Sequence, residues 1–185
     1  MLLLALIACA PEAEPASVCP AYSGLTAAGR TWEYGAFADG STSSRHLEAL
    51  GSEEVMVTST AVTDTYLCDA DGLWIVTRTA TLSDRTARWE YDPPGLEMPA
   101  VLEPGVAWTA DAAWFYSDSL GTTRTESSST QFDVVSTAKS KVTAGAFDTL
   151  EVHILDADAG SDTRYYADGV GLVLSDSAQL VAVDP

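Results

Sequence analysis

The stretch that decides the fold is VTAGAFDTLEVHILDADAGSDTRYYADGVGLV, residues 142–173. Between Phe147 and Leu155, apolar residues alternate with polar or charged ones, a period typical of a strand with one buried face. Residues 157–161 contain Asp158 and Gly160, and Asp168 is followed by Gly169; these residue types favour tight turns. The stretch therefore predicts consecutive antiparallel strands joined by short turns.

The same texture extends back to Gly29, because Thr, Val, Ser, Tyr and Trp dominate and turn residues recur at short intervals. Asp69-Ala-Asp-Gly72 predicts one hairpin turn. The best helical candidate, Arg45–Leu50, is too short to stand alone. We expect residues 29–185 to form an all-β domain, a single antiparallel β-roll or half-barrel of about ten strands with little or no helix.

One segment interrupts the pattern at Asp92-Pro-Pro-Gly95. Proline has no N–H for sheet pairing, so residues 92–104 are predicted to be a loop or crossover. Its apolar residues should then pack over one end of the sheet.

The N-terminus indicates export. Residues Leu2 to Ala8 are wholly apolar but too few to span a bilayer, which needs about 20 residues. Residues 1–8 are typical of the end of a signal peptide, with the true start expected upstream because basic residues are missing. Leu6-Ile-Ala-Cys9 resembles the bacterial lipoprotein box, which implies lipidation of Cys9 and a lipid anchor in the membrane.

Residues 9–28 combine this cysteine with an Ala/Pro-rich tether. Ala10 does not match the aspartate that retains well-studied lipoproteins at the inner membrane, so we expect an outer-membrane lipoprotein facing the periplasm or the surface. The alternative is a cytoplasmic protein with an apolar N-terminus that arose by chance.

Two further cysteines support export. With Cys9 lipidated, Cys19 and Cys68 remain as an even pair, which suits an oxidising compartment. We predict that they form a disulfide. Two unpaired, buried thiols are the alternative.

The chain is strongly acidic, with 27 Asp and Glu against 9 Lys and Arg and a formal net charge of −18. Nucleic-acid binding requires the opposite sign, so we expect no nucleic-acid partner. The charge favours solubility and mutual repulsion at a crowded surface. Binding of divalent cations or of a basic partner is the alternative.

No motif predicts catalysis, and we expect neither an enzyme nor a cofactor. Histidine is the commonest general base, and the chain has only His46 and His153. No nucleophile elbow, zinc motif, phosphate loop or dinucleotide glycine pattern is present.

One acidic loop is a calcium candidate. Asp156, Asp158 and Asp162 place carboxylates at alternate positions, as calcium loops do. The loop departs from the EF-hand pattern and ends without a glutamate, and Asp and Gly are also ordinary turn residues. We therefore expect no metal site. The alternative is a calcium site formed by these three residues.

Several motifs together resemble a known group: Gly29-x-x-Trp32-x-Tyr34, Cys68 to Leu73, Pro104-Gly105-x-x-Trp108, Val142-x-x-Gly145-x-Phe147, and Tyr165-Tyr166-Ala-x-Gly169-Val-Gly171. The set resembles uncharacterised bacterial secreted proteins and lipoproteins described as TapB-like. That resemblance implies an antiparallel β-roll or half-barrel in the cell envelope. It implies no catalytic residue.

The prediction for function is a cell-envelope lipoprotein with a non-catalytic binding or scaffolding role. One alternative is a carrier that holds an apolar ligand, such as a lipid, in a half-barrel groove. An open, Trp-lined concavity would favour the carrier, and a filled interior would contradict it. A second alternative is a calcium-stabilised surface adhesion module.

Overall fold

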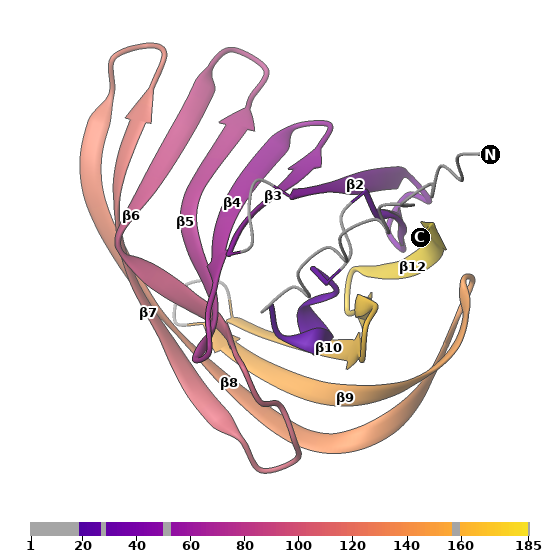
Figure 1. Ribbon diagram of the computed structural model, residues 1–185. Helices are drawn as coiled ribbons and strands as arrows, with labels where there is room; N and C mark the ends of the chain where they lie inside the picture. The colour runs from indigo at the N-terminus through magenta and orange to yellow at the C-terminus, as the bar shows by residue number, and fades with distance from the viewer. Residues whose placement is uncertain (1–18, 27–28, 50–52, 157–159, 185) are drawn as a thin grey trace, which may run out of the picture.

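The computed structural model describes residues 19–26, 29–49, 53–156 and 160–184, and the described chain forms one closed antiparallel β-barrel (Figure 1). The strand order around the barrel is β1-β12-β11-β10-β9-β8-β7-β6-β5-β4-β3-β2. The prediction of an all-β fold is confirmed. The described residues contain twelve strands rather than about ten, and the pairing of β1 with β12 closes the expected half-barrel into a ring.

The elements in chain order are a 3-10 turn η1 (Ala21–Ser23), β1 (Thr31–Ala36), β2 (Thr42–Ala49), β3 (Glu54–Ser59), β4 (Val62–Cys68), β5 (Gly72–Thr81), β6 (Thr86–Pro99), β7 (Ala107–Asp118), β8 (Thr123–Val142), β9 (Gly145–Asp156), β10 (Gly160–Ala167), β11 (Gly171–Ser175) and β12 (Ala178–Asp184). Each strand pairs with the next along the chain, so nearly all connections are hairpins. The candidate helix at 45–50 is strand β2 as far as Ala49.

The hairpin between β4 and β5 confirms the turn predicted at residues 69–72. The Asp69 carboxylate accepts hydrogen bonds from the backbone N–H groups of Asp71 and Gly72, both at 2.9 Å, and from the Trp74 indole at 3.0 Å. Aspartate stabilises turns in this way, by accepting bonds from the backbone that follows it.

The prediction of a loop over residues 92–104 is wrong for its first half, because β6 continues through both prolines to Pro99. On the β5 side, Ile75 pairs with Gly95 and Thr77 pairs with Glu90, so residues 91–94 have no partner there. A bulge leaves residues outside the ladder, and proline can occupy such positions because no N–H is required. The strand therefore bends around its prolines and resumes.

The N-terminal segment packs against the barrel. Cys19 and Cys68 form the predicted disulfide, and Cys19 and Leu25 are buried in the core. A Cβ added to Gly171 would lie 2.8 Å from the carbonyl oxygen of Ser23, so only glycine permits this approach of two backbones. The Gly-Val-Gly pattern in the sequence marks this contact.

The barrel has one thin seam. Between β11 and β12 the ladder contains a single registered pair, Leu174 with Gln179. Two side chains from β1 reach past β12 to the start of β11: the Trp32 indole donates to the Val170 carbonyl at 2.8 Å, and the Tyr34 hydroxyl donates to the Leu172 carbonyl at 3.0 Å. Because both donor side chains are buried, these hydrogen bonds support closure where backbone pairing is sparse.

The main apolar core fills the part of the barrel next to this seam. Its fully buried side chains come from strands across the barrel, and they include Leu47, Cys68, Val134, Val152, Val173 and Leu180. The remaining interior is not filled in this way, and there the lumen opens.

The expected signal peptide, the lipidated Cys9 and Asp158 lie outside the described residues. Within the described part of the chain, no helix is long and apolar enough to cross a membrane.

Candidate ligand-binding site

A cavity of about 890 Å³ occupies the barrel lumen and is lined by residues from all twelve strands. This volume lies within the range of small-molecule sites in proteins, about 300–1,000 Å³. Trp32, Trp89 and Trp114 line it, and Ser23 and Leu25 of the N-terminal segment complete its wall. The interior is therefore an open, Trp-lined concavity, which is the feature expected of a carrier.

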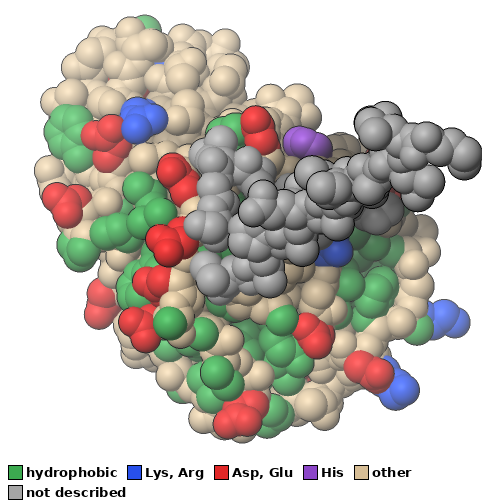
Figure 2. Space-filling view, viewed as in Figure 1, with side chains coloured by type: hydrophobic (Ala, Val, Ile, Leu, Met, Phe, Trp, Pro, Cys, Tyr) green, Lys and Arg blue, Asp and Glu red, His purple; other side chains and the backbone are tan. Residues whose placement is uncertain are grey.

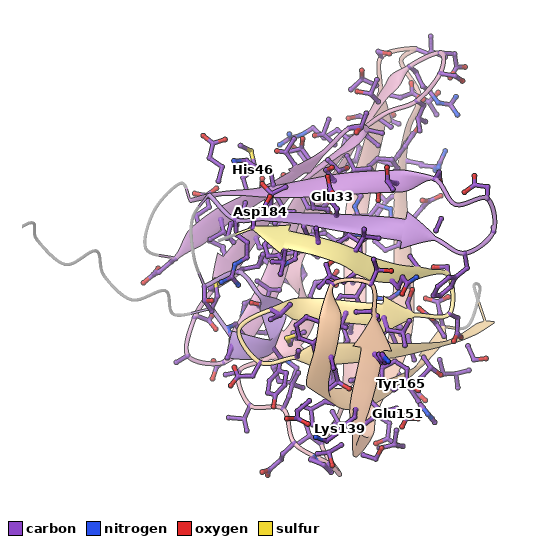
Figure 3. The ribbon with its side chains drawn as sticks, turned by 90° about the vertical axis from the view of Figure 1, so that its right-hand side faces the viewer. Glu33, His46, Lys139, Glu151, Tyr165 and Asp184 are labelled. Carbon is purple, nitrogen blue, oxygen red and sulfur yellow. A yellow bond between two sulfur atoms is a disulfide. The ribbon has the colours of Figure 1, made fainter. Side chains whose placement is uncertain are left out.

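Strand alternation accounts for much of the lining. On β7, Ala110, Ala112 and Trp114 face the lumen, while Ala113 between them does not. On β10, Tyr166 faces the lumen, and Tyr165 lies on the outer face, where it pairs with Glu151 of β9 (Figure 3). Adjacent residues of a strand point to opposite faces, so only one of the two tyrosines is internal.

The lumen is also strongly polar, contrary to the purely apolar groove expected for a lipid carrier. We use "lumen polar cluster" for eight side chains that line the cavity from β4, β5, β6 and β10: Asp64, Tyr66, Arg78, Tyr91, Glu97, Asp162, Arg164 and Tyr166. Since β6 and β10 are separated by three strands in the barrel order, the cluster joins opposite walls.

Four members of the cluster form two ion pairs. Asp64 and Arg78 are register partners on β4 and β5, with Arg78 Nε 2.7 Å from Oδ1 and Nη2 3.0 Å from Oδ2. Hydrogen bonding to Asp64 raises the pKa of Arg78. On the opposite wall, Arg164 Nε lies 2.7 Å from Asp162 Oδ2. Each arginine is thus neutralised by its own aspartate.

Glu97 differs from these paired residues. Its side chain is accessible from the lumen but surrounded by protein, and burial raises its pKa above the ordinary glutamate value. The nearby positive charges of Arg78 and Arg164 oppose that rise, and the negative charge of Asp64 adds to it. Among the described residues, none forms a hydrogen bond or an ion pair with Glu97.

The tyrosines of the cluster line the same cavity as this carboxyl. The charge of Glu97 reaches Tyr66 of β4, Tyr91 of β6 and Tyr166 of β10, and burial is the main cause of the raised pKa of each phenol. The Tyr66 hydroxyl also donates to Asp64 Oδ2 at 3.3 Å. These phenols therefore stay protonated at neutral pH and present hydroxyl donors and aromatic faces to the lumen.

One further cation lines the cavity, outside the cluster. The Arg45 guanidinium carbon lies 5.4 Å from the ring centroid of Tyr34, a distance at which cation–π attraction operates. Burial raises the pKa of Tyr34 to about 12. Three of the nine basic side chains thus line the lumen, and the face seen in Figure 2 carries more acidic than basic side chains.

Two of the three calcium candidates, Asp156 and Asp162, line the lumen. Asp156 accepts a hydrogen bond from Thr130 Oγ1 at 2.7 Å, and Asp162 holds Arg164. Asp158 is outside the described residues, so the calcium loop stays a prediction. Over the described ranges alone, no group of three or more His, Cys, Asp or Glu side chains is placed to hold a metal ion.

Neither histidine faces the lumen. His46 Nδ1 is 3.1 Å from the Thr31 hydroxyl, and His153 Nε2 is 2.9 Å from Glu151 Oε1, both in exposed positions.

The sequence analysis missed the lumen polar cluster because two bulges on β6 and β5 alter the alternation. Leu73 and Ile75 of β5 face inward, and a register shift between Ile75 and Thr77 then brings Arg78 to the same face. In an unbroken strand Arg78 would lie on the side opposite Leu73 and would be assigned to solvent. The available signals were the Asp-Pro-Pro-Gly break opposite this point and the charged residues within otherwise regular strands.

Comparisons with known proteins give no family. No protein-family model matches the chain, and no curated protein matches it. Two solved structures are similar at low identity. A candidate lipoprotein of Parabacteroides distasonis shares 15% identity over 90% of this chain and 99% of its own, with a TM-score of 0.47. A candidate exported protein with a YmcC-like fold from Bacteroides fragilis shares 13% identity over 92% of this chain and 100% of its own, with a TM-score of 0.45. Likeness at this level carries no argument about function, and the TapB-like resemblance stays a prediction.

Proposed function

We propose that this protein is an exported, lipid-anchored carrier that holds one amphiphilic small molecule in its barrel lumen. The observation that carries the proposal is the cavity of about 890 Å³, which is lined by both aromatic rings and charged groups. Three tryptophans and apolar side chains such as Ile75 and Met98 offer a surface for a chain or ring. The lumen polar cluster offers partners for a polar head.

Binding fits this site better than catalysis. A carboxylate with a raised pKa in a cavity is a feature of many active sites. Acid–base catalysis by carboxyl groups commonly uses two of them, one as acid and one as base or nucleophile. Here the aspartates of the cluster are held by arginines, which leaves Glu97 as the one carboxyl of the cluster without a partner among the described side chains.

The envelope location is part of the same proposal. The apolar run before Cys9 supports export and lipidation, and the Cys19–Cys68 disulfide supports an oxidising compartment. A carrier at the outer membrane, facing the periplasm or the surface, would meet amphiphiles at the membrane to which it is anchored.

The test for binding is to purify the protein from its own membranes and to identify small molecules released from it by native mass spectrometry. We expect one amphiphile per chain. Ala112→Phe, which fills the lumen from β7, should abolish this adduct, whereas Ala113→Phe on the opposite face should retain it. Equal adducts in both variants, or none in the unmodified protein, would contradict the carrier.

The test for the anchor is separate. The unmodified chain should partition into the detergent phase and yield an acylated N-terminal peptide, and Cys9→Ala should appear in the aqueous phase. An unmodified Cys9 in the membrane fraction would contradict the lipid anchor and leave the binding proposal standing.

A further inference from the structure

We propose that Glu97 is the recognition residue for a positively charged ammonium group on the ligand, with Tyr66, Tyr91 and Tyr166 forming the walls around that group. This inference rests on the proposed carrier function and specifies the polar head of its ligand.

The first argument is the position of Glu97 in its strand. Leu73 of β5 pairs with Met98 and Trp74 pairs with Leu96, so Glu97 is an extra residue in β6 without a register partner. Leu96, Glu97 and Met98 all line the lumen, which strict alternation would forbid. A bulge re-aims a side chain in this way and is common beside functional sites.

The second argument is that Glu97 has no partner among the described side chains, although two arginines line the same lumen. Asp64 and Asp162 in the same cluster each receive an arginine at 2.7 Å. No described residue hydrogen-bonds to or ion-pairs with Glu97, and burial raises the pKa of its carboxyl. The Glu97 side chain lines the lumen and is exposed to the water there, so its carboxylate is free to meet a charged group of a ligand.

The third argument is the sign of the ligand charge. Arg78 and Arg164 are already engaged by aspartates, so Glu97 is the unmatched charge within the cluster. The three tyrosines that its charge reaches come from three different strands, β4, β6 and β10, and line the same cavity. Aromatic faces attract cations, and cages of aromatic rings are a common way to bind ammonium groups. Both features favour a cation at this point.

The fourth argument is the wider composition of the lumen. Apolar residues, including Leu96 and Met98 directly beside Glu97, continue away from the carboxyl along the wall. A ligand that satisfies both features carries its ammonium group on an apolar chain. Arg45, which lies against Tyr34 outside the cluster, is the alternative anchor for an anionic head.

The experiment compares four probes with the same apolar chain: decylamine, decyltrimethylammonium, decanol and decyl sulfate, each below its micelle concentration. Binding to the full chain is followed by tryptophan fluorescence and calorimetry. We expect both ammonium probes to bind at least about 10-fold more tightly than decanol, a preference on the scale of a single partly desolvated charge contact.

Two variants locate the effect. Glu97→Gln should remove most of the ammonium preference and leave decanol binding unchanged. Glu90→Gln is the matched control, since Glu90 lies on the same strand and is exposed as Glu97 is, but it pairs with Arg88 and does not line the lumen. Unchanged preference in Glu97→Gln, or equal affinity for decylamine and decanol, would overturn the ammonium site but not the carrier.

The remaining outcomes are also distinct. Tightest binding of decyl sulfate would overturn the ammonium site and assign the head group to Arg45. Failure of all four probes to bind, with Ala112→Phe also without effect on any native adduct, would contradict the carrier itself.

A pH series provides an independent readout, because decyltrimethylammonium keeps its charge at every pH. Its affinity should fall as pH is lowered and Glu97 becomes protonated, and Glu97→Gln should abolish this dependence. The other titratable or charged groups that face Glu97 are Asp64 and Tyr66 of β4, Arg78 of β5, Tyr91 of β6, and Asp162, Arg164 and Tyr166 of β10. A pH dependence that persists in Glu97→Gln would assign the titration to one of them and overturn the inference.

Discussion

Arg78 donates hydrogen bonds to both carboxylate oxygens of Asp64 on the neighbouring strand inside the barrel, at 2.7 and 3.0 Å. The two residues are register partners, so the backbone pairing of β4 with β5 positions the contact before either side chain is ordered. The ion pair carries no net charge and lies near Glu97, whose carboxyl has no such partner. Several measurable consequences depend on this difference.

Asp64→Asn should destabilise the fold by about 1–2 kcal/mol, because it removes a charge-assisted double hydrogen bond and leaves Arg78 in the lumen without a counter-charge. The effect is moderate because 41% of the Arg78 side chain is accessible to water. Asp148→Asn is the control, since the Lys139–Asp148 pair is 88% and 87% exposed and should contribute less than about 0.5 kcal/mol. Urea unfolding measures both, and equal losses would contradict the special role of the internal pair.

Glu97→Gln should raise the stability of the ligand-free protein at neutral pH. Burial raises the pKa of Glu97 in the folded state, so the native protein binds its proton more tightly than the unfolded chain does. The stabilisation from that proton is complete below the ordinary glutamate pKa and is lost as pH rises through the raised folded-state pKa. The advantage of Glu97→Gln over the parent should therefore grow as pH rises through this window.

Thermal melts of both proteins across this pH range give the measurement. Comparing the difference between the two proteins removes the opposite contribution of Asp39, Asp69, Asp118 and Glu151, whose pKa values are lowered in the fold. An advantage that shrinks with rising pH would mean that the Glu97 carboxylate is stabilised in the folded protein.

Gly171→Ala should destabilise the protein more than Gly169→Ala does. Both glycines have positive φ, +92° and +67°, so both substitutions carry the left-handed backbone cost of about 1–2 kcal/mol. Only at Gly171 would the new Cβ also meet the Ser23 carbonyl oxygen at 2.8 Å, while at Gly169 nothing lies within 4 Å. Denaturant melts should show the larger loss at 171, and proteolysis should cut near Ser23 first. Equal losses would mean that the N-terminal segment is not held against β11.

Replacing Cys19 and Cys68 together by alanine should cost about 4 kcal/mol, the chain-entropy value for a loop closed over a separation of 49 residues. Urea unfolding with and without a thiol reductant provides the check. Reductant should lower the stability of the parent towards that of the double variant and leave the double variant unchanged. A parent insensitive to reductant after full reduction would show that packing of Cys19 and Leu25 alone secures the segment.

The sequence predicted the fold class because strand signals are local. Alternation between Phe147 and Leu155 predicted β9, and the Asp69–Gly72 turn predicted the β4–β5 hairpin. The order of residue types indicates the local backbone conformation and which face of a strand is buried. Both features are set by residues only a few positions apart in the sequence. The disulfide was predicted from the even cysteine count.

Closure of the barrel was not predictable in the same way. It depends on β1 meeting β12, and on Trp32 and Tyr34 reaching carbonyls of residues 170 and 172. No local pattern encodes a contact across about 140 positions of chain. For the same reason, the sequence suggested a half-barrel and left its interior undecided.

The sequence by itself thus determined an acidic all-β chain with an internal disulfide and a set of hairpins. It also led us to expect export. Only the tertiary structure decided where the charges lie. Val76 of β5 and Glu97 of β6 are each an extra residue in the strand pairing, and a shift by one residue exchanges the two faces of a sheet. Arg78 and Glu97 therefore face the lumen with the tryptophans, and a chain with no catalytic or binding motif acquires a polar site at the centre of its barrel.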